Sequence, residues 1–323
     1  MECKYIEEAL ACYPIADIES AEVTLLRHNE NMTFRVGKEY LLQIHEPVEG
    51  FQVSHIFEGV DRLAVYETEF KFLAYLKEQG MIIREPVENG EGELITRLSG
   101  GRTAAVSRWL EGESLDKLEL SQEYNFRIGA MTAKLHKCAE GFQGFPTVSY
   151  DKAHCDRIRE WIRGLEDRGL NPGYCREMLR ACDAVGALLW KERHGFQMLH
   201  GDLSLSNILQ TKGGLVPIDF AFSGMGHPMF DMANLFANIG SLSDRQGIAA
   251  GYRSAGGVFD FEALDACFVL SVLGGIAIHF EQWSKADWFA DRMKRWCGEI
   301  MGPFGRGERL YREDFYLIHA GER

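Results

Sequence analysis

One stretch of the chain constrains its fold more than any other. Residues 199–209 read Leu-His-Gly-Asp-Leu-Ser-Leu-Ser-Asn-Ile-Leu, and Ile-Asp-Phe follows at 218–220. An apolar run leads into this stretch, and Thr-Lys-Gly-Gly at 211–214 supplies turn residues before the next apolar run. This order predicts a loop that carries Asp202, followed by a small hairpin with Asp219 at its end.

Asp202, Asn207 and Asp219 form a set with a chemical meaning. In ATP-dependent phosphoryl transfer, one Asp orients the attacking hydroxyl and takes its proton, while an Asn and a second Asp hold Mg²⁺ on the phosphates. His-x-Asp-Leu-x-x-x-Asn is the spacing of the protein-kinase catalytic loop, and Asp-Phe-Ala stands where that fold has Asp-Phe-Gly. A single Asp in such a loop is more often a turn residue, but the ordered set favours phosphoryl transfer.

The composition excludes several other classes of protein. The chain has 323 residues, of which 46% are apolar and 26% charged, as in a soluble globular protein with one large domain or two lobes. No apolar run approaches the ~20 residues of a membrane span and the N-terminus lacks a signal-peptide pattern, so we expect a cytoplasmic protein without a membrane partner. A formal net charge of −13 argues against nucleic acid as a partner. The eight cysteines form no Cys-x-x-Cys pair, so we expect neither a disulfide scaffold nor a zinc site.

The first third of the chain predicts a strand-rich lobe with one main helix. A short helix is expected over residues 1–20, and apolar residues at spacings of three and four predict the main helix over 60–79. We place the boundary between an N-terminal lobe, 1–110, and a C-terminal lobe, 111–323. The first three strands form an antiparallel meander, and all five are expected at residues 23–26, 33–36, 40–44, 93–96 and 103–110.

The rest of the chain predicts a mostly helical lobe. Residues 306–323 are polar, and we expect them to be partly mobile. Helices are expected at residues 124–138, 178–189, 232–239, 261–280 and 283–300.

Two motifs in the second lobe match a known family. Residues 200–209, together with 218–233, resemble the paired signature of the aminoglycoside phosphotransferase and choline kinase superfamily. Residues 30–47 are similar to the nucleotide-binding lobe of its homoserine-kinase-like members, and the helix that carries Glu69 resembles their helix with a paired Glu. The resemblance spans roughly residues 20–240. It implies an α+β, two-lobed, protein-kinase-like fold, with an antiparallel sheet and one main helix in the N-lobe and a larger, mostly helical C-lobe.

The resemblance also implies roles for individual residues. Asp202 would be the catalytic base, and Asn207 and Asp219 the Mg²⁺ ligands. Two protein ligands suffice because Mg²⁺ prefers hard oxygen atoms and is completed by phosphate oxygens and water. The strand at 103–110 would include the hinge that meets the adenine of ATP. The residues expected to bind the nucleotide are Asn31, Gln43, Glu69, Ser107 and Trp109.

The chain departs from the family pattern at two places. Where the family usually has Lys or Arg on the third strand, this chain has Gln43, which offers hydrogen bonds but no charge. Arg35 and Lys38 are nearby in sequence. The alternation of side chains along the strands does not place either of them securely where it could replace the missing basic residue. Where the family often has Gly-Asp-Pro, this chain has Gly-His-Pro, and we interpret His227 first as a loop residue and second as a substrate contact.

Other polar and aromatic residues favour structural interpretations. His200 is expected to bond to the backbone and hold the loop, His136 to be a buried, satisfied histidine, and Asp231 to anchor the catalytic loop from the following helix. An aromatic series at helical spacing favours core positions over an acceptor pocket; its members are Trp283, Trp288, Phe289 and Trp296.

The leading interpretation is therefore an ATP- and Mg²⁺-dependent phosphotransferase that acts on a hydroxyl of a small molecule: an amino alcohol, a hydroxy amino acid, a sugar or an aminoglycoside-like compound. Its acceptor pocket is expected from the helices at 150–193 and 259–302. A protein kinase is disfavoured because no Ala-Pro-Glu follows Asp219. The sequence names neither the acceptor nor the oligomeric state.

Two alternatives remain open. A nucleotide-binding pseudokinase with a regulatory role is supported only by Gln43, and the intact catalytic set opposes it. A metal-dependent hydrolase would lack any hydrolase motif and would leave the strand-rich lobe without a purpose; it would be built on His200, Asp202, Asp219 and His227.

Overall fold

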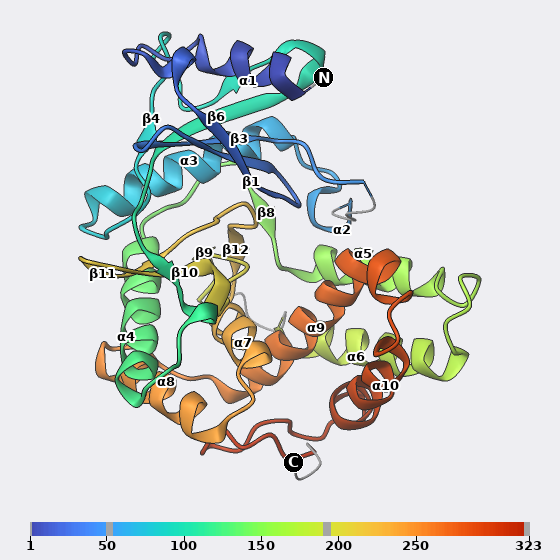
Figure 1. Cartoon of the computed structure of the whole chain (residues 1–323). Coiled ribbons are helices and arrows are strands. Elements are labelled where there is room, and N and C mark those ends of the chain that lie inside the picture. Colours follow the sequence, from blue (N-terminus) through green and yellow to red (C-terminus); the bar gives the residue numbers. More distant parts are fainter. Residues whose placement is uncertain (1, 50–53, 190–194, 320–323) are drawn as a thin grey trace.

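The N-terminal part of the computed structural model, which describes residues 2–49, 54–189 and 195–319, is built around an antiparallel sheet (Figure 1). Its strands lie in the order β1-β2-β3-β6-β4, and β5 also pairs with β6. The predicted meander of three strands is confirmed. The strands are β1 Val23–His28, β2 Met32–Val36, β3 Tyr40–Ile44, β4 Pro86–Val87, β5 Thr96–Arg97 and β6 Thr103–Arg108.

Two of these strands differ from the prediction. A strand was expected over 93–96, but the observed strand, β5, begins only at residue 96. Strand β4 was not predicted. Each contains two residues, which is too short for the alternation of apolar and polar side chains to be seen in a sequence.

Two helices cover opposite faces of the sheet. Helix α1, Glu2–Leu10, packs its apolar side chains on one face, and α3, Arg62–Glu78, packs on the other. Helix α1 ends ten residues before the predicted end, and Pro14, which disfavours a helical conformation for the residue before it, lies in the segment that was expected to continue it. Helix α3 begins where Asp61 accepts a hydrogen bond from the backbone N–H of Leu63 at 3.0 Å.

Alternation along β3 assigns each side chain to a face. Leu42 and Ile44 belong to the apolar cluster under α1, so Gln43 between them points to the face of α3. Gln43 pairs with Ala105 of β6, which belongs to the cluster under α3. The third-strand position thus faces the same side as Glu69 on α3, as the family resemblance implied.

The second part of the chain is mostly helical (Figure 1). One of the expected helices is broken: residues 283–300 contain the end of α9, then α10, then a π-helical segment, Trp296–Met301. The α-helices are α2 Ser54–Phe57, α4 Gln122–Ala139, α5 Lys152–Arg163, α6 Pro172–Leu189, α7 Met229–Asn238, α8 Leu242–Ser254, α9 Phe261–Trp283, α10 Phe289–Arg295 and α11 Gly302–Gly305.

Helix α9 is the central helix of this part. Within the described residues it is the one helix long and apolar enough, by length and composition, to cross a membrane. Of its most apolar window, 67% is buried inside the protein, as expected of a core helix. Its buried Asp265 accepts hydrogen bonds from the backbone N–H groups of Leu310, at 3.1 Å, and Tyr311, at 2.9 Å. The expected mobility of the C-terminal segment is therefore wrong for these residues, which are buried in the core.

Two small sheets complete the fold. The first joins β7 Glu113–Ser114 to the hairpin of β10 Ile208–Thr211 and β11 Gly214–Pro217, and the second contains β8 Val148–Ser149, β9 Gln197–Leu199 and β12 Gly224–Gly226. The predicted lobe boundary at 110/111 falls between β6 and β7, and its exact position stays a prediction. The fold class is confirmed: an α+β protein with an antiparallel sheet and one main helix, followed by a larger helical part.

Candidate active site

The predicted loop and hairpin are present. Strand β9 ends at Leu199, the loop carries Asp202, and the hairpin of β10 and β11 ends just before Asp219. Gly201 adopts a left-handed φ of 82°, and a Cβ there would lie 2.0 Å from the carbonyl oxygen of Phe222. The loop therefore requires glycine directly before Asp202.

Asp231 of α7 anchors the loop through its backbone. It is buried, and its carboxylate accepts hydrogen bonds from the backbone N–H groups of His200, at 3.0 Å, and Gly201, at 2.9 Å. His136 of α4 donates a third hydrogen bond at 3.1 Å and bonds Tyr252 through its other nitrogen. Burial opposes ionisation of Asp231, but the hydrogen bond and charge of His136 hold its pKa below the usual value. The predicted roles of Asp231 and His136 are confirmed.

His200 is part of the same structural network. Its Nε2 lies 2.9 Å from the carbonyl oxygen of Ile218, and its Nδ1 accepts a hydrogen bond from the backbone N–H of Asp202 at 3.3 Å. Burial lowers the pKa of His200, so the ring is neutral, and both of its nitrogens serve the backbone. His200 holds the loop, as predicted. It has no lone pair left for the metal of the alternative hydrolase.

Asp202 is held by Asn207. The amide nitrogen of Asn207 donates to both the backbone oxygen and Oδ2 of Asp202, at 2.9 Å each. Burial and, after it, the negative charge of Asp219 raise the pKa of Asp202 to about 7, and the Asn207 hydrogen bond opposes both. A carboxyl group that titrates near neutral pH is suited to take a proton from an alcohol.

Asp219 adopts a conformation that is rare for residues other than glycine. Its φ is 67°, in the left-handed region, where Asp and Asn are found more often than other side chains. Its carboxylate forms an ion pair with Arg27 of β1, which also pairs with Glu30 at 3.1 Å. Burial and the charge of Asp219 raise the pKa of Glu30 to about 8. The cluster brings three carboxyl groups and one cation together where the two parts of the fold meet.

The donor atoms at this cluster fit a magnesium ion. Asn207 uses its amide nitrogen on Asp202, which leaves its oxygen available, and Asp219 supplies a carboxylate. Among the described residues no group of three or more His, Cys, Asp and Glu side chains forms a metal site. Two oxygen ligands suit an ion whose remaining positions belong to phosphate oxygens and water.

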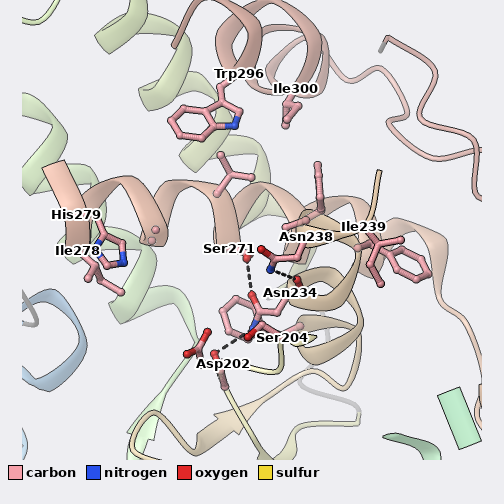
Figure 2. Close-up of a pocket in the computed structure, with 18 of the residues that line it drawn as sticks. Asp202, Ser204, Asn234, Asn238, Ile239, Ser271, Ile278, His279, Trp296 and Ile300 are labelled. Carbon is pink, nitrogen blue, oxygen red and sulfur yellow. Dashed lines mark hydrogen bonds between the residues drawn. The ribbon is translucent and has the colours of Figure 1, made fainter. Parts of the chain in front are cut away.

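A large cavity opens beside the catalytic loop. It has a volume of about 1130 Å³ and is lined by Asp202, Asn207 and Asp219, together with residues from α7, α9 and the π-helical segment. Figure 2 shows Asp202 and Ser204 of the loop near Asn234 of α7 and Ser271 of α9.

Asn234 connects the loop to the cavity wall. Its amide nitrogen donates to the carbonyl oxygen of Gly201 at 3.0 Å, and its amide oxygen accepts a hydrogen bond from Ser271 (Figure 2). The loop that carries Asp202 is therefore tied both to α7 and to α9. Neither Asn234 nor Ser271 was predicted, because nothing in the local pattern distinguishes a cavity-lining residue from other polar helix residues.

The aromatic series lies differently from the prediction. Trp283, Trp288 and Trp296 line the cavity. Trp283 and Trp296 also pack against the core, so the core interpretation holds in part for them, but it is wrong for the exposed Trp288. Phe289 is buried and packs on Phe280. The helical spacing failed because α9 ends at Trp283 and the next helix starts at Phe289. His227 is a loop residue, as first interpreted, and accepts a hydrogen bond from the backbone N–H of Met229 at 3.2 Å.

The expected acceptor segments contribute part of the wall. Tyr150 and His154 come from the first of them, and the residues of α9 and the π-helical segment come from the second. Positions 190–193 of the first segment lie outside the described residues. The structure adds Arg245 of α8 and Tyr311 of the C-terminal segment, which were not expected.

The five predicted nucleotide residues do not line this cavity. Four of them, Asn31, Gln43, Glu69 and Ser107, are buried around the sheet and α3. Three of these carry a buried polar atom without a hydrogen-bond partner: Asn31 Nδ2, Glu69 Oε2 and Ser107 Oγ. Unpaired buried polar atoms are rare in folded proteins, and a ligand can supply the missing partners.

Trp109 follows β6 and is occupied on two sides. Its ring nitrogen donates to Glu111 at 2.8 Å, and the guanidinium of Arg35 lies 4.4 Å from its ring centre. The stacking fixes the plane of the indole at the end of the strand that the sequence predicts as the hinge.

Comparison with known proteins extends the argument beyond this chain. A curated homoserine kinase from Janthinobacterium sp. (strain Marseille) is 31% identical over 115 residues, which are 35% of this chain and 31% of that protein. The match thus spans about a third of the length of the curated relative.

Solved structures match over nearly the whole chain. A microcompartment-associated aminopropanol kinase has a TM-score of 0.73 and 21% identity, with 94% of this chain and 97% of that chain covered. The amicoumacin kinase hAmiN, in complex with AMP-PNP, Ca²⁺ and Ami, has a TM-score of 0.67 and 15% identity, with 95% and 94% covered. A choline/ethanolamine kinase family protein from Mesorhizobium loti has a TM-score of 0.62 and 19% identity, with 93% and 95% covered. At these identities the likeness shows a shared fold.

The family itself follows from the sequence match. The model of the phosphotransferase enzyme family (APH) matches residues 22–267, which include the sheet, α3, the catalytic loop and the start of α9. The loop geometry around Asp202 and the matched span agree, and the chain belongs to the phosphotransferase enzyme family.

Proposed function

We propose that this phosphotransferase transfers the γ-phosphoryl group of ATP to a hydroxyl of a small molecule, with Mg²⁺ as the metal. The observation that carries the proposal is the position of Asp202: it lines the large cavity, its pKa is raised to about 7, and Asn207 holds one of its oxygens. In this role Asp202 accepts a hydrogen bond from the acceptor hydroxyl, orients it and takes its proton.

Asn207 and Asp219 hold the metal in this proposal. When bound, Mg²⁺ neutralises the phosphate charge that develops during transfer. Asn207 has a second function, because its amide nitrogen keeps Asp202 in place while its oxygen is left for the metal. The fixed loop, anchored by Asp231, keeps the base and the metal ligands at a constant separation.

The nucleotide lies, in this proposal, between the sheet and the catalytic loop. Asn31, Gln43, Glu69, Ser107 and Trp109 are the residues proposed to contact it, and the unpaired atoms of three of them support this assignment. Gln43 offers no charge to the phosphates, so another group of the chain must offset their charge or ATP will bind weakly.

The acceptor occupies the cavity beyond Asp202. Its wall combines amide and hydroxyl groups, such as Asn234 and Ser271, with the indole rings of Trp283 and Trp296. Amino alcohols and hydroxy amino acids are the first acceptors to test, since the similar proteins include an aminopropanol kinase and a homoserine kinase. Sugars and aminoglycosides also fit a cavity of about 1130 Å³. The net charge of −13 supports an enzyme without a nucleic-acid partner.

The test is a screen for acceptor-dependent release of ADP. The purified protein is incubated with Mg²⁺ and ATP and with amino alcohols, hydroxy amino acids, sugars and aminoglycosides in turn. We expect at least one compound to raise the rate well above that of slow ATP hydrolysis, and the Asp202→Asn variant to lose this stimulation. Tight binding of Mg²⁺ and ATP without ADP release from any acceptor would instead support a regulatory pseudokinase.

A further inference from the structure

Arg27 lies in the same cross-strand row of the sheet as Gln43. The pairing of β1 and β2 places Arg27 opposite Thr33, and the pairing of β2 and β3 places Thr33 opposite Gln43. Ala105 of β6 completes the row. Residues directly opposite each other in a sheet carry their side chains on the same face. Since Ala105 belongs to the apolar cluster under α3, the whole row faces α3 and the catalytic loop.

The row contains one cation, Arg27 on β1. The family usually has its basic residue two strands away, at the position of Gln43 on β3. Gln43 is buried and does not line the cavity. Arg27 does line it, and its side chain is 42% exposed, although it pairs with Asp219 and Glu30. The residue between them is Thr33, whose side chain is short and half-buried.

A metal bound at Asp219 would bring phosphates within reach of Arg27. Each Mg–O bond is about 2.0–2.1 Å, so a metal that bridges a carboxylate and a phosphate holds their oxygens within about 4 Å of each other. Arg27 already contacts the carboxylate of Asp219. Its guanidinium fork is suited to bind phosphate oxygens in pairs.

We propose that Arg27 supplies the phosphate-binding charge that Gln43 lacks. Without nucleotide, Arg27 pairs with Asp219; with nucleotide bound, Asp219 would hold Mg²⁺ and Arg27 would contact the phosphates. This inference rests on the proposed function. It makes Arg27 a nucleotide-positioning residue and also gives the ligand-free site a positive charge that offsets its carboxylates.

Arg84 is the other cation near Asp219 and Glu69. It stands just before β4, on the far side of β6 from β3, and it does not line the cavity. Burial lowers the pKa of Arg84, and the charges of Asp219 and Glu69 oppose that shift. Its Nε is buried without a partner. Arg84 is therefore a half-buried cation that does not face the cavity, whereas Arg27 does.

The test measures binding directly, without an acceptor. Calorimetric titration of wild type and Arg27→Gln with Mg²⁺ and AMP-PNP is expected to show about 10- to 100-fold weaker binding in the variant, as for loss of a charged hydrogen bond. Adenosine, which has no phosphates, should bind both proteins with the same affinity. The matched control is Arg97→Gln, an exposed arginine of the same sheet that does not line the cavity, and it should bind as wild type does.

A rescue variant tests whether the two positions of the row are interchangeable. Gln43→Lys is expected to restore most of the AMP-PNP affinity in the Arg27→Gln protein, and to add much less in the wild type, where the charge is already present. An equal gain in both backgrounds would show that the positions act independently and would overturn the inference.

Other results would also overturn it. AMP-PNP binding unchanged in Arg27→Gln, or lost in Arg84→Gln instead, would assign the charge elsewhere. An equal loss for adenosine and AMP-PNP would show a merely structural role for Arg27. If wild type binds neither Mg²⁺ with AMP-PNP nor ATP, the proposed function fails, and the role of Arg27 fails with it.

Discussion

The catalytic loop and the side of the site beside the sheet, the proposed nucleotide side, are built in opposite ways. In the loop, the polar groups that hold Asp202 have protein partners: Asp231 bonds two backbone N–H groups and His136, and Asn207 bonds Asp202. Beside the sheet, Glu69 Oε2, Ser107 Oγ and Asn31 Nδ2 are buried without partners. The loop is complete in the protein alone, whereas we propose that a bound nucleotide supplies the missing partners beside the sheet. Loss of a loop residue should therefore damage catalysis or folding, and loss of a nucleotide-side residue should be tolerated until ligand is added.

The largest effect is expected at the base. Asp202→Asn should lower kcat by about 10²- to 10⁴-fold, the usual contribution of a general base, with nucleotide affinity within a few-fold of wild type. Steady-state kinetics on an acceptor from the screen checks the rate, and calorimetry checks the affinity. Asp167→Asn, at an exposed position, is the control and should be fully active. Near-normal turnover by Asp202→Asn would show that Asp202 is not the catalytic base.

The next effect concerns the anchor of the loop. Asp231→Ala leaves two backbone N–H groups and a buried histidine without their acceptor, and should lower the free energy of unfolding by about 3 kcal/mol or more. Urea unfolding measures this loss. Asp156→Ala removes exposed pairs with Lys152 and Arg159 and should cost less than about 1 kcal/mol. Similar losses in the two variants would mean that the loop is not held as described.

A third effect depends on pH and belongs to the sheet. His45 is buried, stacks on Tyr66 at 3.7 Å and bonds Thr103 at 2.7 Å, and burial lowers its pKa to about 3. The ordinary value is about 6.5, so the unfolded chain binds the proton more tightly than the folded one. Above about pH 6.5 His45 is neutral in both states and does not change the free energy of unfolding. As the pH falls from 6.5 toward 3, protonation of His45 in the unfolded chain lowers the free energy of unfolding by at most about 1.4 kcal/mol per pH unit.

Unfolding free energies of wild type and His45→Gln at several pH values check this prediction. The variant lacks the titrating ring, so its stability should fall less steeply between pH 6.5 and pH 4. Parallel curves for the two proteins would show that other groups cause the acid sensitivity.

The last effect is expected at Glu69. Burial first, and then the charges of Asp219 and Glu30, raise its pKa to about 8, and Arg84 opposes them. The unfolded chain ionises Glu69 near the ordinary pKa of about 4.3, so the stability of wild type falls as the pH rises from that value through 8. In the ligand-free protein Glu69→Gln removes this loss, because the amide stays neutral in both states, and the variant should be the more stable protein at pH 7.

Melting temperatures without ligand, at pH 7 and pH 9, measure this difference, and the variant should be the more stable protein at pH 9. A loss of 3 kcal/mol or more would show that Glu69 already forms a buried ion pair, which would end the contrast between the two regions.

The sequence predicted most of what lies close together along the chain. The strands of the meander, α3, the hairpin, and the roles of His200 and Asp231 were expected from short patterns and agree with the structure. The patterns failed where a helix was interrupted, as at Trp288, and where a polar segment is held by a distant buried group, as Asp265 holds Leu310. Helical spacing assumes a continuous helix, and composition does not show a buried carboxylate 45 residues away.

The sequence by itself determined that Asp202, Asn207 and Asp219 lie close together. A short loop and a tight hairpin join them, so local geometry brings them to one place. The tertiary structure decided the rest of the site. Arg27 meets Asp219 across 192 positions of the chain only because the sheet packs over the catalytic loop in one register. The wall of the cavity likewise depends on where α7, α9 and the π-helical segment pack. Such contacts follow from the packing of whole elements, which no local pattern in the sequence records.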